Sequence, residues 1–206
     1  MTPHPFPRLR WAAVAWLAVW LPAYWAFYGP VTFLNLCDIA VILTCAGLWR
    51  GSALLLSTQA VSSLVVDAAW LVDLGWRAAT GRHLLGGTEY MWDPTYPAWL
   101  RALSLFHVLL PVTLLYALRR VGYDRHALAA QSALAAVVLA VSRTYGPEAN
   151  VNFSFADPVL GRSWGPAPVH LAVILGGLAL VYAGTAFALG RGLPPAVRRT
   201  SPAEAG

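Results

Sequence analysis

The sequence contains no lysine and few charged residues of any kind. All fourteen basic residues are arginines, and Asp, Glu, Lys and Arg together make up only 11% of the 206 residues. A soluble domain needs more polar surface than this composition supplies. The scarcity of charge therefore excludes an ordinary soluble fold. We interpret the basic isoelectric point of about 9.6 as membrane topology and headgroup contact rather than nucleic-acid binding.

Cysteine is also scarce, since the chain has only Cys37 and Cys45. The two lie in one predicted helix, eight residues apart, which corresponds to roughly 12 Å at 1.5 Å per residue. That separation excludes a disulfide between them. Plausible metal ligands occur in the chain, but none has the local spacing of a metal motif. We therefore expect neither a metal nor another cofactor.

Long apolar runs are what the sequence has in abundance: 58% of the residues are apolar, and the mean hydropathy is +0.58. Six runs have the roughly 17–25 residues that a helix needs to cross a bilayer. The sequence therefore predicts an all-α polytopic membrane protein with a single membrane domain over 1–206. The expected helices cover approximately 11–28, 31–49, 53–75, 100–118, 126–143 and 168–189.

The arginines are distributed unevenly between the two sides that six spans define. Nine of the fourteen fall in the head, the turn at Arg50, the loop 119–125 and the tail after 189. Cytoplasmic segments carry the excess of Lys and Arg, so both termini are predicted to be cytoplasmic, with 190–206 as a disordered cytoplasmic tail. The long loops 77–99 and 145–167 would face outward. We expect a multi-pass protein of the bacterial cytoplasmic (inner) membrane.

Four ionisable or nucleophilic side chains fall at matching depth within the predicted spans. Counting from the outer end of each helix at 1.5 Å per residue places Cys37, Asp38, Asp67 and His107 at roughly 9–12 Å. Ionisable residues inside a membrane are expensive and usually functional. We therefore expect these groups to form a polar pocket on the outer side. Asp73 lies on the same face of its helix but near the interface, where we expect it to be solvated.

This set of residue types is typical of nucleophilic catalysis. In such a site His107 would take a proton from Cys37, and Asp38 or Asp67 would orient the imidazole. The interfacial residues Arg101 and Arg143 would hold a phosphate headgroup. Two asparagines, Asn35 and Asn152, complete the predicted substrate-binding set.

Short motifs in the chain resemble two membrane-protein families. The segments Leu36-Cys37-Asp38, Asn150-Val151-Asn152-Phe153 and Gly165-Pro166-Ala167-Pro168 resemble the YwaF-like bacterial integral membrane proteins. More distantly, Thr32-Phe33-Leu34-Asn35 and the stretch from His107 to Pro111 are similar to the androgen-induced intramembrane hydrolases, six-span enzymes that cleave fatty-acid esters with a threonine and a histidine. The first resemblance implies Cys37 as nucleophile, and the second implies Thr32. On one continuous helix these positions lie about 140° apart, so we expect only one of them to face His107.

Two classes of function remain open from the sequence. The first is a lipid acyl-ester hydrolase or acyltransferase that uses the outer pocket. The second is a small-molecule carrier or substrate-binding membrane subunit, in which the same polar layer binds a solute without a nucleophile. Membrane lipids are the expected partners, together with a lipid or small-molecule ligand.

Overall fold

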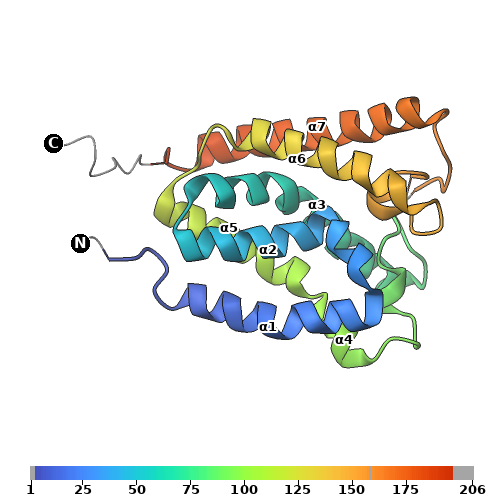
Figure 1. Cartoon of the computed structure of the whole chain (residues 1–206), viewed down its shortest axis with the longest axis horizontal. Helices are drawn as coiled ribbons and strands as arrows, with labels where there is room; N and C mark the ends of the chain where they lie inside the picture. Colours follow the sequence, from blue (N-terminus) through green and yellow to red (C-terminus); the bar gives the residue numbers. More distant parts are fainter. Residues whose placement is uncertain (1–2, 158, 197–206) are drawn as a thin grey trace.

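The computed structural model describes residues 3–157 and 159–196 and shows helices aligned along one long axis (Figure 1). The α-helices are α1 (Leu9–Tyr28), α2 (Leu36–Arg50), α3 (Ala53–Thr80), α4 (Ala98–Leu103), α5 (Phe106–Val121), α6 (Ala127–Ser142) and α7 (Ala167–Gly192). Four short 3-10 turns join them, namely η1 (Pro30–Leu34), η2 (Glu89–Met91), η3 (Arg143–Tyr145) and η4 (Val151–Phe153). Within the described ranges no strand is formed, which confirms the all-helical prediction.

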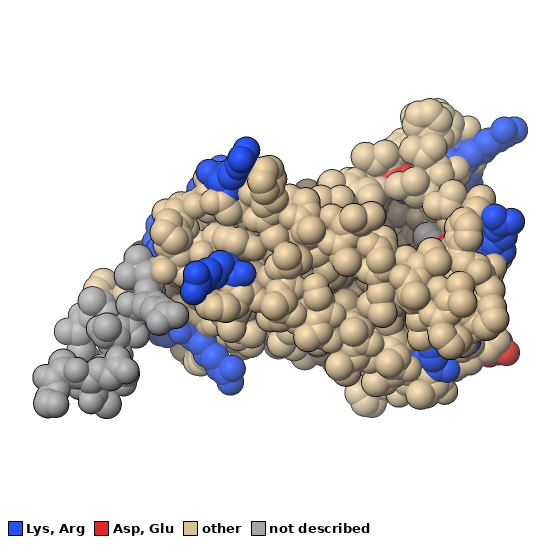
Figure 2. All heavy atoms as spheres, turned by 90° about the horizontal axis from the view of Figure 1, so that it is seen from above, with Lys and Arg blue, Asp and Glu red and all other residues tan. Residues whose placement is uncertain are grey.

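Five segments are long and apolar enough to cross a membrane: Leu9–Tyr28, Ala53–Thr80, Ala98–Val121, Ala127–Tyr145 and Ala167–Gly192. The face shown in Figure 2 has arginines toward the two ends of the long axis and no charged residue in the broad band between them. An apolar band with charged ends is typical of a membrane protein.

The helix expected over 31–49 is broken near its N-terminal end. Pro30–Leu34 form η1, and Asn35 is extended with φ −63° and ψ 134° before α2 begins at Leu36. The Asn35 side chain donates to the Thr32 carbonyl over 2.9 Å, an example of an asparagine that competes with the helical backbone. The remaining α2 has 15 residues, about 22 Å at 1.5 Å each, so it is shorter than a full span.

The helix expected over 100–118 is also divided. It separates into α4 and α5 at Ser104 and Leu105, and the Ser104 hydroxyl pairs with the Tyr24 hydroxyl at 2.6 Å. Pro111 lies inside α5. The helices expected over 11–28, 53–75, 126–143 and 168–189 are present as α1, α3, α6 and α7, with α3 extending to Thr80.

Helix α3 lies at the centre of the bundle, because α2, α5, α6 and α7 all pack against it. Its approach to α2 is close: a Cβ atom added at Gly47 would lie 3.0 Å from the Leu56 side chain. Eleven α3 residues are buried, seven of them Ser, Thr, Gln or Asp. The central helix therefore carries a polar face into the middle of an apolar bundle.

Both ends of the described chain lie at the same end of the bundle (Figure 1). His4 Nε2 lies 3.0 Å from the Trp49 carbonyl oxygen, and the Tyr123 N–H donates to the Pro194 carbonyl over 2.8 Å. The segment 190–206 was expected to be a tail, but α7 continues to Gly192. Residues 197–206 of that expected tail lie outside the described residues.

Candidate functional site

A cavity of about 780 Å³ lies at the end of the bundle formed by the two long loops. Helices α1, α2, α3, α5 and α7 contribute to its wall, together with residues of both loops. Seven of the nine predicted site residues line it: Thr32, Asn35, Cys37, Asp38, Asp67, His107 and Asn152. The structure therefore brings together groups that are up to 120 residues apart in the sequence.

Asp38 lies between the two candidate nucleophiles. The Thr32 hydroxyl donates to Asp38 Oδ2 over 2.8 Å, and Cys37 Sγ lies 3.9 Å from Asp38 Oδ1. The expectation that only one of the two nucleophiles faces His107 assumed a continuous helix. The break at Asn35 removes that assumption, so both Thr32 and Cys37 line the cavity.

Cys37 is the second residue of α2, a position that affects the chemistry of its thiol. The first turn of a helix has unpaired N–H groups and the positive end of the helix dipole. The N–H of Leu36, the first residue, is already taken by Asn152 Oδ1 at 2.8 Å. The site therefore holds the thiol beside the positive end of α2.

His107 is held in one orientation by its neighbours. Its Nδ1 lies 2.8 Å from the Ser104 carbonyl oxygen, so in the neutral ring this nitrogen carries the hydrogen and Nε2 is the acceptor. The ring stacks on Trp70, with centroids 4.4 Å apart and planes 7° from parallel, and also on Phe106. We had expected a carboxylate to orient the imidazole. A backbone carbonyl does so instead, made available by the break between α4 and α5.

Asp67 lies on the other side of the imidazole, 4.0 Å from Oδ1 to His107 Nε2. Its side chain is fully buried, and neither carboxyl oxygen has a hydrogen-bond partner among the described residues. Asp67 therefore points into the bundle interior, beside His107. Its two oxygens are therefore buried beside the cavity without a protein partner among the described residues.

The two asparagines build the wall of the cavity. The Asn152 amide donates to the Leu34 carbonyl at 2.8 Å and to Ser142 Oγ at 3.0 Å, while its Oδ1 accepts from the Leu36 N–H. It adopts a positive φ of 52°, which asparagine tolerates better than most residues. Asn35 and Asn152 line the cavity, but the hydrogen bonds of their side chains hold the chain break in place.

The two arginines predicted to bind a headgroup do not line the cavity. Arg101 donates to the Met91 carbonyl over 2.7 Å. Arg143 donates to the Ser154 carbonyl over 2.6 Å and lies 4.0 Å from the Phe155 ring centroid. Each arginine therefore anchors one of the long loops, because backbone carbonyls in those loops accept from its guanidinium.

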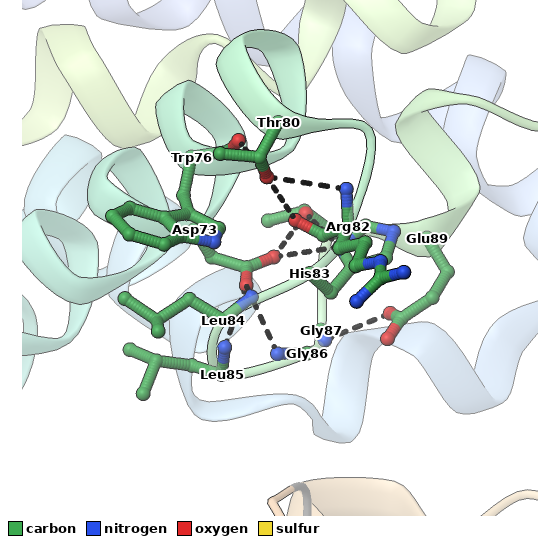
Figure 3. Close-up of polar contacts among 11 residues, drawn as sticks. Asp73, Trp76, Thr80, Arg82, His83, Leu84, Leu85, Gly86, Gly87 and Glu89 are labelled. Atoms are coloured by element: carbon green, nitrogen blue, oxygen red, sulfur yellow. Dashed lines mark hydrogen bonds and ion pairs between the residues drawn. The ribbon is translucent and has the colours of Figure 1, made fainter.

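Asp73 forms a second polar centre that the sequence did not reveal (Figure 3). We expected it to be solvated, but it is fully buried. Its carboxylate accepts from the backbone N–H groups of three successive residues, with distances of 2.7 to 3.1 Å, and contacts two further side chains. These partners are Leu84, Leu85, Gly86, His83 and Thr88.

The loop that Asp73 fastens is part of the cavity wall, since Leu85, Gly86 and Gly87 line it. Asp73 thus positions one wall of the cavity without lining it. The one sequence signal for this role is that Asp73 shares a helix face with Asp67, while the partner N–H groups belong to an irregular loop with no pattern of its own.

Among the residues that the structure describes, no group of three or more His, Cys, Asp or Glu side chains could hold a metal ion. Comparisons of the chain with protein-family models, with curated proteins and with solved structures found no match.

Proposed function

We propose that the chain is a membrane enzyme that transfers or hydrolyses the acyl group of a lipid ester, with Cys37 as nucleophile and His107 as base. One observation carries the proposal: a thiol at a helix N-terminus and an imidazole with an available Nε2 line the same cavity. Covalent catalysis needs a nucleophile and a base at one site, and Cys37 and His107 line one cavity from separate helices.

The reaction would proceed in two steps. His107 Nε2 takes the proton of the Cys37 thiol, the thiolate attacks the ester carbonyl, and the leaving alkoxide receives the proton back from the imidazolium. An acceptor alcohol or water then attacks the Cys37 thioester and gives its proton to Nε2. The acyl group leaves with the acceptor, and the thiol is restored.

Other groups of the cavity could stabilise the charges that develop during the reaction. The Tyr28 hydroxyl and the Trp70 indole N–H line the cavity and have no partner among the described residues, so either is available as a donor to the carbonyl oxygen of the intermediate. Asp67, next to His107 Nε2, stabilises the imidazolium. Apolar residues such as Ile174 and Leu178 complete the wall, and the cavity volume is in the range of sites that enclose small ligands.

Thr32 is the alternative nucleophile, because its hydroxyl already donates to a carboxylate, that of Asp38. In that mechanism Asp38 would take the hydroxyl proton and the intermediate would be an oxygen ester. The two intermediates differ chemically: neutral hydroxylamine cleaves a thioester readily and an ordinary alkyl ester far more slowly.

The experiment is to trap the intermediate on the purified protein. The protein in detergent is mixed with p-nitrophenyl octanoate, quenched in acid and digested, and the acylated peptide is located by mass spectrometry. We expect a hydroxylamine-sensitive octanoyl group on Cys37, absent in Cys37→Ser and retained in the matched control Cys45→Ser. An adduct on Thr32 that survives in Cys37→Ser would transfer the proposal to threonine, and acylation of neither residue would overturn it.

A second candidate is a carrier or solute-binding subunit, favoured by the two unpartnered oxygens of Asp67. A solute with hydrogen-bond donors or a positive charge would satisfy them, and no nucleophile would be needed. This candidate gains support if ligand binding depends on Asp67 while no acyl adduct forms. In both cases we propose a bacterial inner-membrane protein with cytoplasmic termini, an outward-facing cavity and membrane lipids as partners.

A further inference from the structure

The cavity wall carries acidic side chains but no strongly basic one. Asp38 and Asp67 are both part of it, whereas no arginine is found among the described residues that line it. Asp67 is fully buried and Asp38 is 3% exposed, so both carboxyl groups lie just behind the surface that a ligand would touch. Neither oxygen of Asp67 has a hydrogen-bond partner in the described part of the chain. Buried carboxyl groups are costly unless they are compensated, and a positive charge in the cavity would compensate them.

His107 does not supply that charge in its neutral form. Its Nδ1 lies 2.8 Å from the Ser104 carbonyl oxygen, so the hydrogen of the neutral ring is on Nδ1 and Nε2 is an acceptor. Nε2 lies 4.0 Å from Asp67 Oδ1. Two acceptors therefore lie side by side at this point of the wall, which favours a cationic ligand over an anionic one.

The part of the wall that a ligand can touch is largely aromatic. Tyr28, Tyr90 and Tyr96 line the cavity and are partly exposed. The Tyr28 ring centroid lies 4.9 Å from that of Tyr96 and 6.3 Å from that of Tyr90, and the Tyr24 ring lies 5.0 Å away on the same helix. Asp38 is close enough to interact electrostatically with the Tyr24 and Tyr28 hydroxyls. Aromatic faces attract a cation that lies within about 6 Å of a ring centroid.

A phosphate group has no comparable partners in this wall. Protein sites for phosphate use arginine, lysine or the N–H groups of a helix N-terminus. Arg101 and Arg143 donate to backbone carbonyls of the long loops instead. Helix α2 begins at the wall, but Asp38 occupies its first turn and the Leu36 N–H donates to Asn152 Oδ1. A phosphate in the cavity would therefore face carboxyl groups without a compensating cation.

We propose that the cavity binds a ligand that carries an ammonium group and no phosphate. The tyrosine rings provide the contact surface, and the carboxyl groups of Asp38 and Asp67 attract the charge. For the identity of an ester substrate this rests on the proposed function: the ammonium group then belongs to the leaving alcohol. The Cys37 thiolate displaces an amino alcohol, which takes the proton of the His107 imidazolium. Binding of the ammonium group itself requires no nucleophile.

Binding is measured by isothermal titration calorimetry on the full chain in dodecyl maltoside, with protein-free micelles as the blank. The probes are hexyltrimethylammonium and hexyl phosphate, which have the same chain. We expect only the ammonium probe to bind, and Asp67→Asn and Asp38→Asn should each weaken it about tenfold, which corresponds to about 1.4 kcal/mol. The matched control is Asp124→Asn, because Asp124 is partly exposed and lies outside the wall.

Three results would overturn the proposal. They are no binding of the ammonium probe, equal binding of the two probes, and ammonium binding that neither aspartate variant weakens. Choline, which lacks the hexyl chain, identifies the source of the ammonium group. Choline that binds as tightly as hexyltrimethylammonium indicates a free solute, whereas weaker binding of choline indicates a lipid ester.

A pair of variants at Tyr28 tests the aromatic contact. Tyr28→Phe keeps the ring and removes the hydroxyl, whereas Tyr28→Leu removes the ring. Because a cation binds to the face of the ring, only Tyr28→Leu should weaken binding of hexyltrimethylammonium. Equal weakening in both variants would assign the contact to the hydroxyl and overturn the aromatic part of the site.

The same titrations on Cys37→Ser, which cannot form a thioester, separate the ammonium site from acyl transfer. An adduct from p-nitrophenyl octanoate without ammonium binding would overturn the ammonium site alone, and ammonium binding without an adduct would overturn acyl transfer alone. Where both hold, octanoylcholine should acylate Cys37 about tenfold faster than the neutral isostere in which a tert-butyl group replaces the trimethylammonium group. Equal rates would exclude the ammonium group from the substrate.

Discussion

The Nε2 atom of His107 lies 4.0 Å from the Oδ1 atom of Asp67. This distance is too long for a direct hydrogen bond. It is short enough for the Asp67 carboxylate to stabilise a positive charge that develops on the imidazole. The Nδ1 atom is already committed to the Ser104 carbonyl. Nε2 is therefore the nitrogen available for proton transfer, and a carboxylate stands beside it.

The first prediction concerns His107. Replacing it with Gln keeps a polar side chain of comparable reach but removes the base, so acylation of Cys37 should slow by about 100-fold or more. The measurement is the rate of octanoyl adduct formation by mass spectrometry. His126→Gln is the control, because the His126 side chain is 59% exposed and does not line the cavity. Equal rates in His107→Gln and wild type would remove His107 from the mechanism.

The second prediction concerns the cost of burying Asp67. Asp67→Asn removes a fully buried carboxyl group without a protein partner, and a neutral amide is cheaper to desolvate. We expect the thermal midpoint to rise by about 2–4 °C, which corresponds to about 1 kcal/mol in a chain of this size. Intrinsic tryptophan fluorescence during heating measures it. Asp124→Asn, at a partly exposed position, should leave the midpoint unchanged, and a lower midpoint for Asp67→Asn would mean that the carboxylate is needed for folding.

Cys37, Asp38, Asp67 and His107 line one cavity, and the sequence indicates their proximity because the rise of a helix is constant and membrane spans are roughly parallel. Counting residues is then enough to locate a layer. The set of residues that line the cavity is determined by contacts between residues that are far apart in the sequence. The break before α2 is supported by Asn152, 116 residues away, and no pattern around Asn35 alone indicates it.

The loops were the least predictable part for a similar reason. Asp73 is satisfied mostly by backbone N–H groups, and Arg101 and Arg143 donate to backbone carbonyls. Every residue has the same backbone groups, so the sequence does not indicate which of them will bond to a given side chain. Charged residues near a predicted interface were therefore assigned to solvent or to headgroups.

A third prediction separates the two properties of Asn152. Its side chain makes three hydrogen bonds that support the start of α2, and its backbone has a positive φ. Asn152→Gly loses the hydrogen bonds but accommodates the backbone, so it should cost about 2–4 kcal/mol at about 1 kcal/mol per bond. Asn152→Ala should cost about 1 kcal/mol more, because alanine disfavours that conformation. Unfolding in denaturant compares the two variants, and equal stability of both with wild type would contradict the role assigned to the side chain.

A fourth prediction tests the orientation in the membrane. Nine of the fourteen arginines occur in segments that we assign to the cytoplasm, and two of those segments meet where Tyr123 bonds to Pro194. A reporter that is active only in the cytoplasm should work after Gly206 and fail when inserted near Gly86. A periplasmic reporter at the same two sites should show the opposite pattern. Cytoplasmic activity at Gly86 would reverse the orientation and make the cavity open inward.

The last prediction is that Asp73 keeps the loop over the cavity closed. Its carboxylate receives three successive backbone N–H groups (Figure 3), and no single neutral side chain at this position can replace all of them. Asp73→Ala leaves the N–H groups of Leu84, Leu85 and Gly86 without their acceptor. We expect these amides to exchange with deuterium at least about tenfold faster, because losing even one hydrogen bond worth about 1.4 kcal/mol favours local opening by that factor.

Reaction of Cys37 with a thiol reagent should accelerate in the same Asp73→Ala variant, because the released residues line the cavity that contains the thiol. Asp93→Ala is the matched control. Asp93 is a partly exposed acidic residue of the same long loop, and its carboxylate accepts only from Thr95. Its removal should leave both the exchange at Leu84 and the reactivity of Cys37 unchanged. Faster exchange without faster labelling would mean that the loop is held by Asp73 but does not limit access to the cavity, so reagents and substrates would enter between the helices from the lipid side.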